Sequence, residues 1–226
     1  MDVFFGSGRM NSFAELWNSL DLSAISAALV RVLGVFLCLT VHETCHGLAA
    51  YALGDPTAKK AKRLSLNPLQ HIDWFGFASM LLLGFGWAKP VPVDMTYFKK
   101  PKRGMALTAL AGPVSNLLLA ALLMLLAKCI SLYAVYTPAW GWVFGFCWRT
   151  AVLSIGLAVF NLIPIPPLDG SKVLAAVLPD TAYLTLMRYE RYGMAALLVL
   201  MYLGVGDNIL GRAITAVYSF LSNLIL

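Results

Sequence analysis

The chain has 226 residues, of which 60% are hydrophobic and only 12% are charged. Soluble proteins carry roughly a quarter charged residues, so this composition excludes an ordinary soluble domain and indicates a membrane protein. The net charge of +6 would suit a nucleic-acid partner in a soluble protein. Here the positions of the basic residues favour a topological meaning instead, and we expect no nucleic-acid partner.

Residues 1–21 mix Phe, Trp and Leu with polar residues and lack a basic stretch followed by a small-residue cleavage site. The pattern predicts no cleaved signal peptide. It predicts an N-terminal interfacial segment with an amphipathic helix near 11–20. The alternative is a disordered tail.

Several apolar stretches reach or approach the roughly 20 residues that cross a hydrocarbon core. They lie at 22–54, 104–127 and 140–163, with two shorter ones at 192–205 and 208–226. We therefore expect an all-α polytopic membrane protein with a membrane-embedded core at 22–180. Residues 181–226 would add C-terminal transmembrane helices, as two spans, one span or a helical hairpin.

The first span contains an H-E-x-x-H motif, His42-Glu43-Thr44-Cys45-His46. Helical spacing puts both histidines on one face, where the imidazoles can share one zinc ion. Glu43 lies roughly 100° around the helix from His42, beside the position of a metal-bound water. This arrangement predicts hydrolysis by zinc-activated water, with Glu43 as the general base.

A structural role is the common alternative for a histidine in an apolar helix. The chain has only three histidines and three glutamates, so a chance match to the motif is on the order of one in a thousand. Ionisable residues inside a bilayer are costly and mark functional sites by default. The metal-site interpretation is therefore the stronger one.

Nine of the seventeen basic residues follow the first span. They are Lys59, Lys60, Lys62, Arg63, Lys89, Lys99, Lys100, Lys102 and Arg103. By the positive-inside rule, this density predicts that 55–104 is cytoplasmic, that 128–140 lies outside and that 164–191 is cytoplasmic again. We expect a multi-pass protein of the plasma membrane with its site toward the cytoplasmic side.

Within the cytoplasmic segment, residues 74–87 are apolar and glycine-rich but too short to span. They predict a re-entrant, β-hairpin-like segment at about 74–94 that packs against helices or lines a wet cavity. Pro90 and Pro92 suit an edge strand of that hairpin.

Asn116 follows Gly112-Pro113 at the opening of the second span and places an amide inside the membrane. Such a group either joins helices or donates to the oxyanion that forms when water attacks a carbonyl. From the residues alone, packing is the favoured interpretation.

Two histidines leave a catalytic zinc one protein ligand short, because such sites usually have three. Asp169 is the candidate, since it follows the proline-broken end of the third span at a depth similar to that of His46. As an alternative, Asp169 could cap a helix at 171–178. His71 competes as a ligand, although a structural hydrogen bond or a substrate-side role suits its polar surroundings better.

In these motifs the sequence resembles the site-2 protease family of intramembrane zinc metalloproteases. The resemblance covers roughly residues 35–175 in several markers that occur in the same order. They are His42-Glu43-Thr44-Cys45-His46, Asn67-Pro68 with His71-Ile72-Asp73, Gly112-Pro113 with Asn116, and Asn161 with Pro164, Pro167, Leu168, Asp169 and Gly170.

The resemblance implies a three-helix catalytic core in which His42, His46 and Asp169 hold one Zn²⁺ ion. It implies that Asn116 steadies the tetrahedral intermediate, which reverses the packing preference. It also implies that the re-entrant hairpin offers an edge strand to an unwound substrate. The substrate-binding residues would then be Asn67, His71, Pro90, Val91 and Pro92.

The chain looks like a compact form of the family, with the zinc motif on its first span and no PDZ domain. The expected partners are a transmembrane protein or peptide substrate and the lipid bilayer, and partner subunits of a homo-oligomer could gate access. The alternative functions are a zinc-binding membrane transporter and a non-catalytic scaffold. Convergence of the polar groups at one depth favours a site over an ion path.

Overall fold

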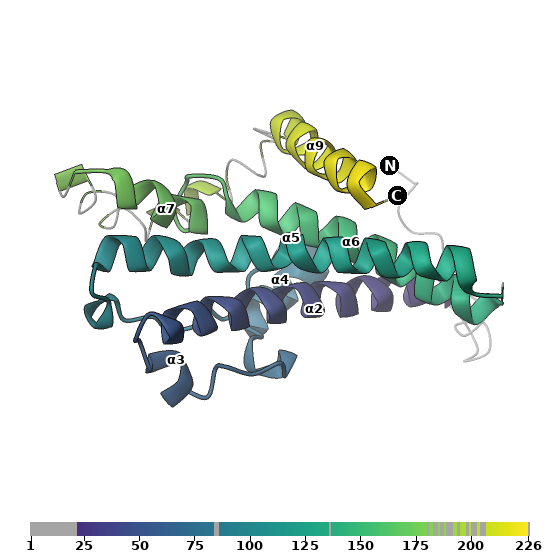
Figure 1. Ribbon diagram of the computed structural model, residues 1–226, viewed down its shortest axis with the longest axis horizontal. Coiled ribbons are helices and arrows are strands. Elements are labelled where there is room, and N and C mark those ends of the chain that lie inside the picture. The colour runs from purple at the N-terminus through teal and green to yellow at the C-terminus, as the bar shows by residue number, and fades with distance from the viewer. Residues whose placement is uncertain are drawn as a thin grey trace, which may run out of the picture.

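The computed structural model describes residues 22–83, 86–135, 137–179 and 207–225, with scattered positions between 181 and 203. Three long helices, α2, α5 and α6, run side by side along the longest axis of the molecule (Figure 1). In chain order the helices are α2 (Leu22–Ala52), α3 (Thr57–Lys60), α4 (Trp74–Leu83), α5 (Pro101–Tyr133), α6 (Pro138–Asn161), α7 (Asp169–Val177) and α9 (Asp207–Ile225), with 3₁₀ turns η1 (Pro68–Gln70) and η2 (Met95–Tyr97).

Three of the described helices are long and apolar enough to cross a membrane: Ser26–Ala52, Pro101–Tyr133 and Pro138–Asn161. They correspond to the three predicted core spans, so the all-α, multi-span prediction is confirmed at this level. Leucines such as Leu29, Leu118 and Leu122 remain more than half exposed on their outer faces, as expected where lipid replaces water.

Small residues let α5 and α6 approach closely. Ala120 and Ala127 of α5 and Ala151 of α6 are almost fully buried, together with Met124 and Ile155. In a membrane, such small residues allow the backbone contact that holds helices together. α9 packs obliquely on this pair, partly through an edge-to-face contact between Trp148 and Tyr218 (Figure 1).

The predicted β-hairpin at 74–94 is wrong for the part of it that the structure describes. Residues 74–83 form helix α4, and the described pairing around it is an isolated antiparallel bridge between Ile72, before the helix, and Ala88, after it. The Asp73 carboxylate accepts a hydrogen bond from the N–H of Gly76, and so caps the helix. An apolar segment must pair its own backbone N–H and C=O groups. A helix does this most easily when the segment contains no proline.

Two further boundaries differ from expectation. Gly112-Pro113 lies in the middle of α5, because that helix begins already at Pro101 and not at 104. α6 ends at Asn161, before the Pro164-Ile165-Pro166-Pro167 run. The expected segment 1–21 and half of the expected span 192–205 lie outside the described residues.

Candidate metal centre

The two motif histidines stand one turn apart on α2, with their Nε2 atoms 3.0 Å from each other. Their rings meet edge to face, with centroids 4.5 Å apart. Both side chains are buried. The predicted helical pairing of His42 and His46 on one face is therefore what the structure contains.

Asp169 reaches the same point from the other end of the sequence. Its Oδ2 atom lies 3.1 Å from Nε2 of His42 and 3.1 Å from Nε2 of His46. The carboxyl group stands at the first position of α7, directly after the irregular connection that follows α6. Its side chain turns toward the histidines. Asp169 therefore does not cap the helix, which was the alternative role.

Two glycines permit this convergence. A Cβ atom on Gly112 would lie 2.6 Å from Cε1 of His42 and would also collide with the His46 ring. A Cβ atom on Gly170 would collide with the backbone of Leu162. Helix α5 can therefore approach α2, and the start of α7 can pack against the end of α6, only because these positions carry no side chain.

The three ligand atoms fit a zinc ion. Tetrahedral zinc with ligands at about 2.0–2.1 Å separates those ligands by roughly 3.3 Å, close to the 3.0–3.1 Å seen among His42, His46 and Asp169. No other group of three metal-binding side chains occurs among the described residues. A two-histidine, one-carboxylate set leaves a fourth position for water or substrate, as catalytic zinc sites do.

The atoms of these three side chains that face away from the cluster also have partners. Nδ1–H of His46 donates to the carbonyl of Thr108 over 2.7 Å, and Nδ1 of His42 lies 3.1 Å from the carboxamide of Asn116. The second oxygen of Asp169 faces Lys172 at 3.9 Å. Burial by itself raises the pKa of Asp169, but hydrogen bonds with His42 and His46 hold that pKa well below its usual range, so the group is an anion ready to bind a cation.

Glu43 lies beside this cluster without joining it. Its Oε2 atom accepts a hydrogen bond of 2.9 Å from the backbone N–H of Val91. The side chain is almost fully buried, so the bond replaces one that water would otherwise provide. A glutamate held next to the metal ligands, with its second oxygen unused by this bond, suits a general base.

The segment that carries Val91 is pinned on both sides by bonds within the protein. Arg63, a residue that the sequence gave no reason to single out, donates to the carbonyls of Lys89 and Pro90, as well as to that of Gln70. The N–H of Lys89 donates to the carbonyl of His71. The N–H groups of Lys89 and Val91 and the carbonyls of Lys89 and Pro90 are thus bonded within the protein. The expected edge strand at Pro90 and Pro92 stays a prediction.

The other two candidate substrate residues are held by local hydrogen bonds. The Asn67 side chain accepts from the N–H of Leu69 and caps η1. His71 is buried and its Nε2–H donates to the carbonyl of Ser65 over 2.8 Å. The cluster that could hold a metal does not include it, which agrees with the structural hydrogen bond favoured over ligation.

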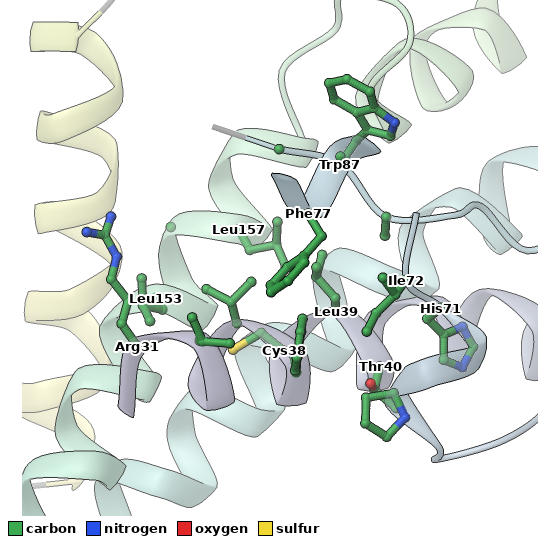
Figure 2. Close-up of a pocket in the computed structure, with 18 of the residues that line it drawn as sticks. Arg31, Cys38, Leu39, Thr40, His71, Ile72, Phe77, Trp87, Leu153 and Leu157 are labelled. Carbon is green, nitrogen blue, oxygen red and sulfur yellow. The ribbon is translucent and has the colours of Figure 1, made fainter. Parts of the chain in front are cut away.

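A largely apolar cavity of about 660 Å³ lies between α2, the helix that carries His42 and His46, and helices α4, α6 and α9. Figure 2 shows Arg31 at one end and His71 at the other, with Phe77 of α4 between them. His42, Glu43 and Asp169 are not among its lining residues, so the cavity adjoins the metal centre without containing it.

Comparison with known proteins gives matches that are consistent with this geometry. Peptidase family M50 matches residues 126–204, a stretch that contains Asp169 but begins after the histidines. "Putative zinc metalloprotease YwhC" of Bacillus subtilis (strain 168) is 37% identical over 190 residues, 82% of this chain and 85% of that protein. "Putative zinc metalloprotease Rip2" of Mycolicibacterium smegmatis is 26% identical over 185 residues, 80% of this chain and 69% of that protein. No solved structure matches the chain.

A buried pair of histidines and a carboxylate, enclosed by helices that can span a bilayer, defines the class as a membrane metalloprotease. The extent of the similarity then gives the particular group: this chain belongs to the site-2 protease family of zinc metalloproteases, peptidase family M50. The predicted family and its zinc cofactor are thereby confirmed.

Proposed function

We propose that this protein hydrolyses peptide bonds of membrane-spanning proteins near the cytoplasmic side of the plasma membrane, with His42, His46 and Asp169 as zinc ligands. The convergence of two imidazoles and one carboxylate within 3.1 Å carries this proposal. Bound there, zinc supplies Lewis acidity that makes water a better nucleophile and polarises the scissile carbonyl.

Glu43 is the group that would take a proton from water and later give it to the leaving amine. It is adjacent in sequence to His42, and the bond from Val91 fixes one of its oxygens. Burial of the site excludes bulk water, which strengthens each electrostatic contact with the reacting carbonyl. The proton transfer therefore needs only the remaining oxygen of this carboxylate.

The depth of the site supports a substrate that resides in the membrane. His46 precedes the end of α2 at Ala52 by six residues, or about 9 Å of helix. The basic residues that follow α2 favour a cytoplasmic location for this end. A bond cut here would lie just below the lipid surface on that side.

A zinc transporter or a non-catalytic scaffold would use the same histidines. The polar groups gather at one depth around a single cluster, with no second metal-binding group among the described residues, and this favours hydrolysis over an ion path.

The test uses the Glu43→Gln variant as a trap in reconstituted membranes. Membrane proteins that co-purify with the variant are identified and then incubated with the unmodified protein and with the variant. We expect cleavage by the unmodified protein only, with zinc bound in both. Equal cleavage by the variant would contradict the role of Glu43, and absence of cleavage of every captured protein would contradict the hydrolase proposal.

A further inference from the structure

The carboxamide of Asn116 lies on the opposite side of the His42 ring from Asp169. It is 3.1 Å from Nδ1 of His42, whereas Asp169 faces Nε2 of the same ring. A donor for the oxyanion must reach the open coordination position, but this amide sits behind the ligand. Its location therefore suits a group that acts on the imidazole and not on the substrate.

The protonation of His42 decides which end of the amide faces it. Nε2 must present a lone pair to a metal, so the neutral ring carries its proton on Nδ1. An Nδ1–H requires an acceptor, which the amide oxygen supplies and the amide NH₂ cannot. A half-turn of the carboxamide exchanges its two ends without moving any other atom.

The surroundings hold the amide in place. Asn116 is completely buried, and its Oδ1 has no hydrogen-bond partner among the described residues when Nδ2 faces the ring. The backbone carbonyl of the same residue accepts from Ser154 of α6 over 2.8 Å. Asn116 thus lies where α2, α5 and α6 meet, and in the described structure only His42 contacts its side-chain amide.

Both histidines then make the same kind of hydrogen bond, from Nδ1–H to an acceptor on α5. Nδ1–H of His46 donates to the carbonyl of Thr108, four residues before Gly112 on α5. With the carboxamide turned, Nδ1–H of His42 would donate to the side-chain oxygen of Asn116, four residues after Gly112. Outer hydrogen bonds of this kind fix the tautomer and the orientation of ligating imidazoles. Helix α5 provides both.

From this geometry we infer that Asn116 is a positioning residue, whose side-chain oxygen accepts from Nδ1–H of His42 and orients that ring for zinc. The inference rests on the proposed zinc site. It replaces the role in steadying the tetrahedral intermediate that the family resemblance implied. The two roles differ in what they change: positioning alters metal affinity, whereas oxyanion stabilisation alters turnover at unchanged affinity.

The first experiment measures the zinc dissociation constant of the purified full chain by competition with a chromogenic chelator. We expect Asn116→Leu to raise it about 10- to 100-fold, because loss of an outer partner of a ligating histidine has that effect. Asn116→Asp, which keeps an acceptor, should stay within a few-fold of the unmodified protein. Ser154→Ala is the control, since it removes the bond to the Asn116 backbone and leaves the side chain intact.

Wild-type affinity in Asn116→Leu would overturn the inference, and so would equal weakening in Ser154→Ala. Asp169→Ala separates the two levels of the argument. If that variant keeps zinc, the proposed metal site itself fails. If Asp169→Ala loses zinc and Asn116→Leu does not, only the role of Asn116 fails.

A second measurement needs no variant and guards against a misfolded one. The chain has three histidines, so ¹⁵N-histidine spectra of the zinc-loaded protein in micelles are simple to assign. We expect His42 and His46 to coordinate through Nε2 and to carry protons on Nδ1. Coordination of His42 through Nδ1 would overturn the inference.

Discussion

The backbone N–H of Val91 donates a hydrogen bond to Oε2 of Glu43 over 2.9 Å. Val91 stands between Pro90 and Pro92, which have no N–H, so it is the one residue of the three that can make this bond. Arg63 holds the carbonyls of Lys89 and Pro90. The orientation of Glu43, the proposed general base, therefore depends on a buried arginine of another segment.

Arg63→Met tests this dependence. Without its hydrogen bonds the 89–91 segment loses its anchor, and we expect cleavage of a captured substrate to fall about tenfold or more while zinc content stays unchanged. The exposed Lys60→Met is the matched control and should cleave normally. Full activity in Arg63→Met would show that Glu43 needs no such support.

Gly112→Ala should weaken zinc binding. The added Cβ would meet Cε1 of His42 at 2.6 Å and collide with His46, so both rings would have to move. We expect the zinc dissociation constant to rise about tenfold or more. Gly145→Ala, on α6, meets nothing within 4 Å and is the control that should keep full affinity. Equal affinity in the two variants would contradict the close approach of α5 to the ligands.

Asp55→Ala should destabilise the segment after α2 and leave the zinc ligands in place. The carboxylate is completely buried and accepts from the N–H of Asp94 over 2.7 Å and from that of Thr57 over 2.8 Å. Leaving these donors unpaired costs about 1–3 kcal/mol. Thermal unfolding in detergent measures the loss. Asp94→Ala keeps its N–H and the bond to Asp55 but loses the exposed cap of η2, so it should lose less stability, and a larger loss there than in Asp55→Ala would contradict the account.

Acid should release the metal through the histidines. The pKa of Asp169 lies below its usual range, so this group stays ionised while the imidazoles take up protons as pH falls. Because zinc binds only unprotonated imidazoles, protons compete with the ion, and zinc affinity should fall as pH falls, by up to about 100-fold per pH unit where two protons compete. Titration with a metal-sensitive dye follows the change. Affinity independent of pH between 5 and 7 would exclude ligation by two histidines.

The sequence predicted the chemistry of this protein better than its local geometry. Residue type and helical spacing alone paired His42 with His46, because a helix repeats every 3.6 residues. Helical spacing could not pair Asp169 with the histidines, because 123 residues separate it from His46. Only the folded chain shows the two side chains in contact. From the sequence, the place of Asp169 could be argued only from its depth beside His46 and from the family resemblance.

The connection between α2 and α5 was predicted less well. The glycine-rich run at 74–87 suggested a hairpin, but most of it forms α4, capped by Asp73. The role of Arg63 was hidden because its partners are backbone carbonyls, which leave no pattern in the sequence. The same holds for Thr108, which contacts His46 through its carbonyl.

The zinc content of the purified protein tests the central claim most directly. By metal analysis we expect one zinc ion per chain in the unmodified protein and almost none in Asp169→Ala, with Asp73→Ala, which removes only the α4 cap, retaining its metal. Undiminished zinc in Asp169→Ala would contradict the claim that this carboxylate and the two histidines form the metal centre.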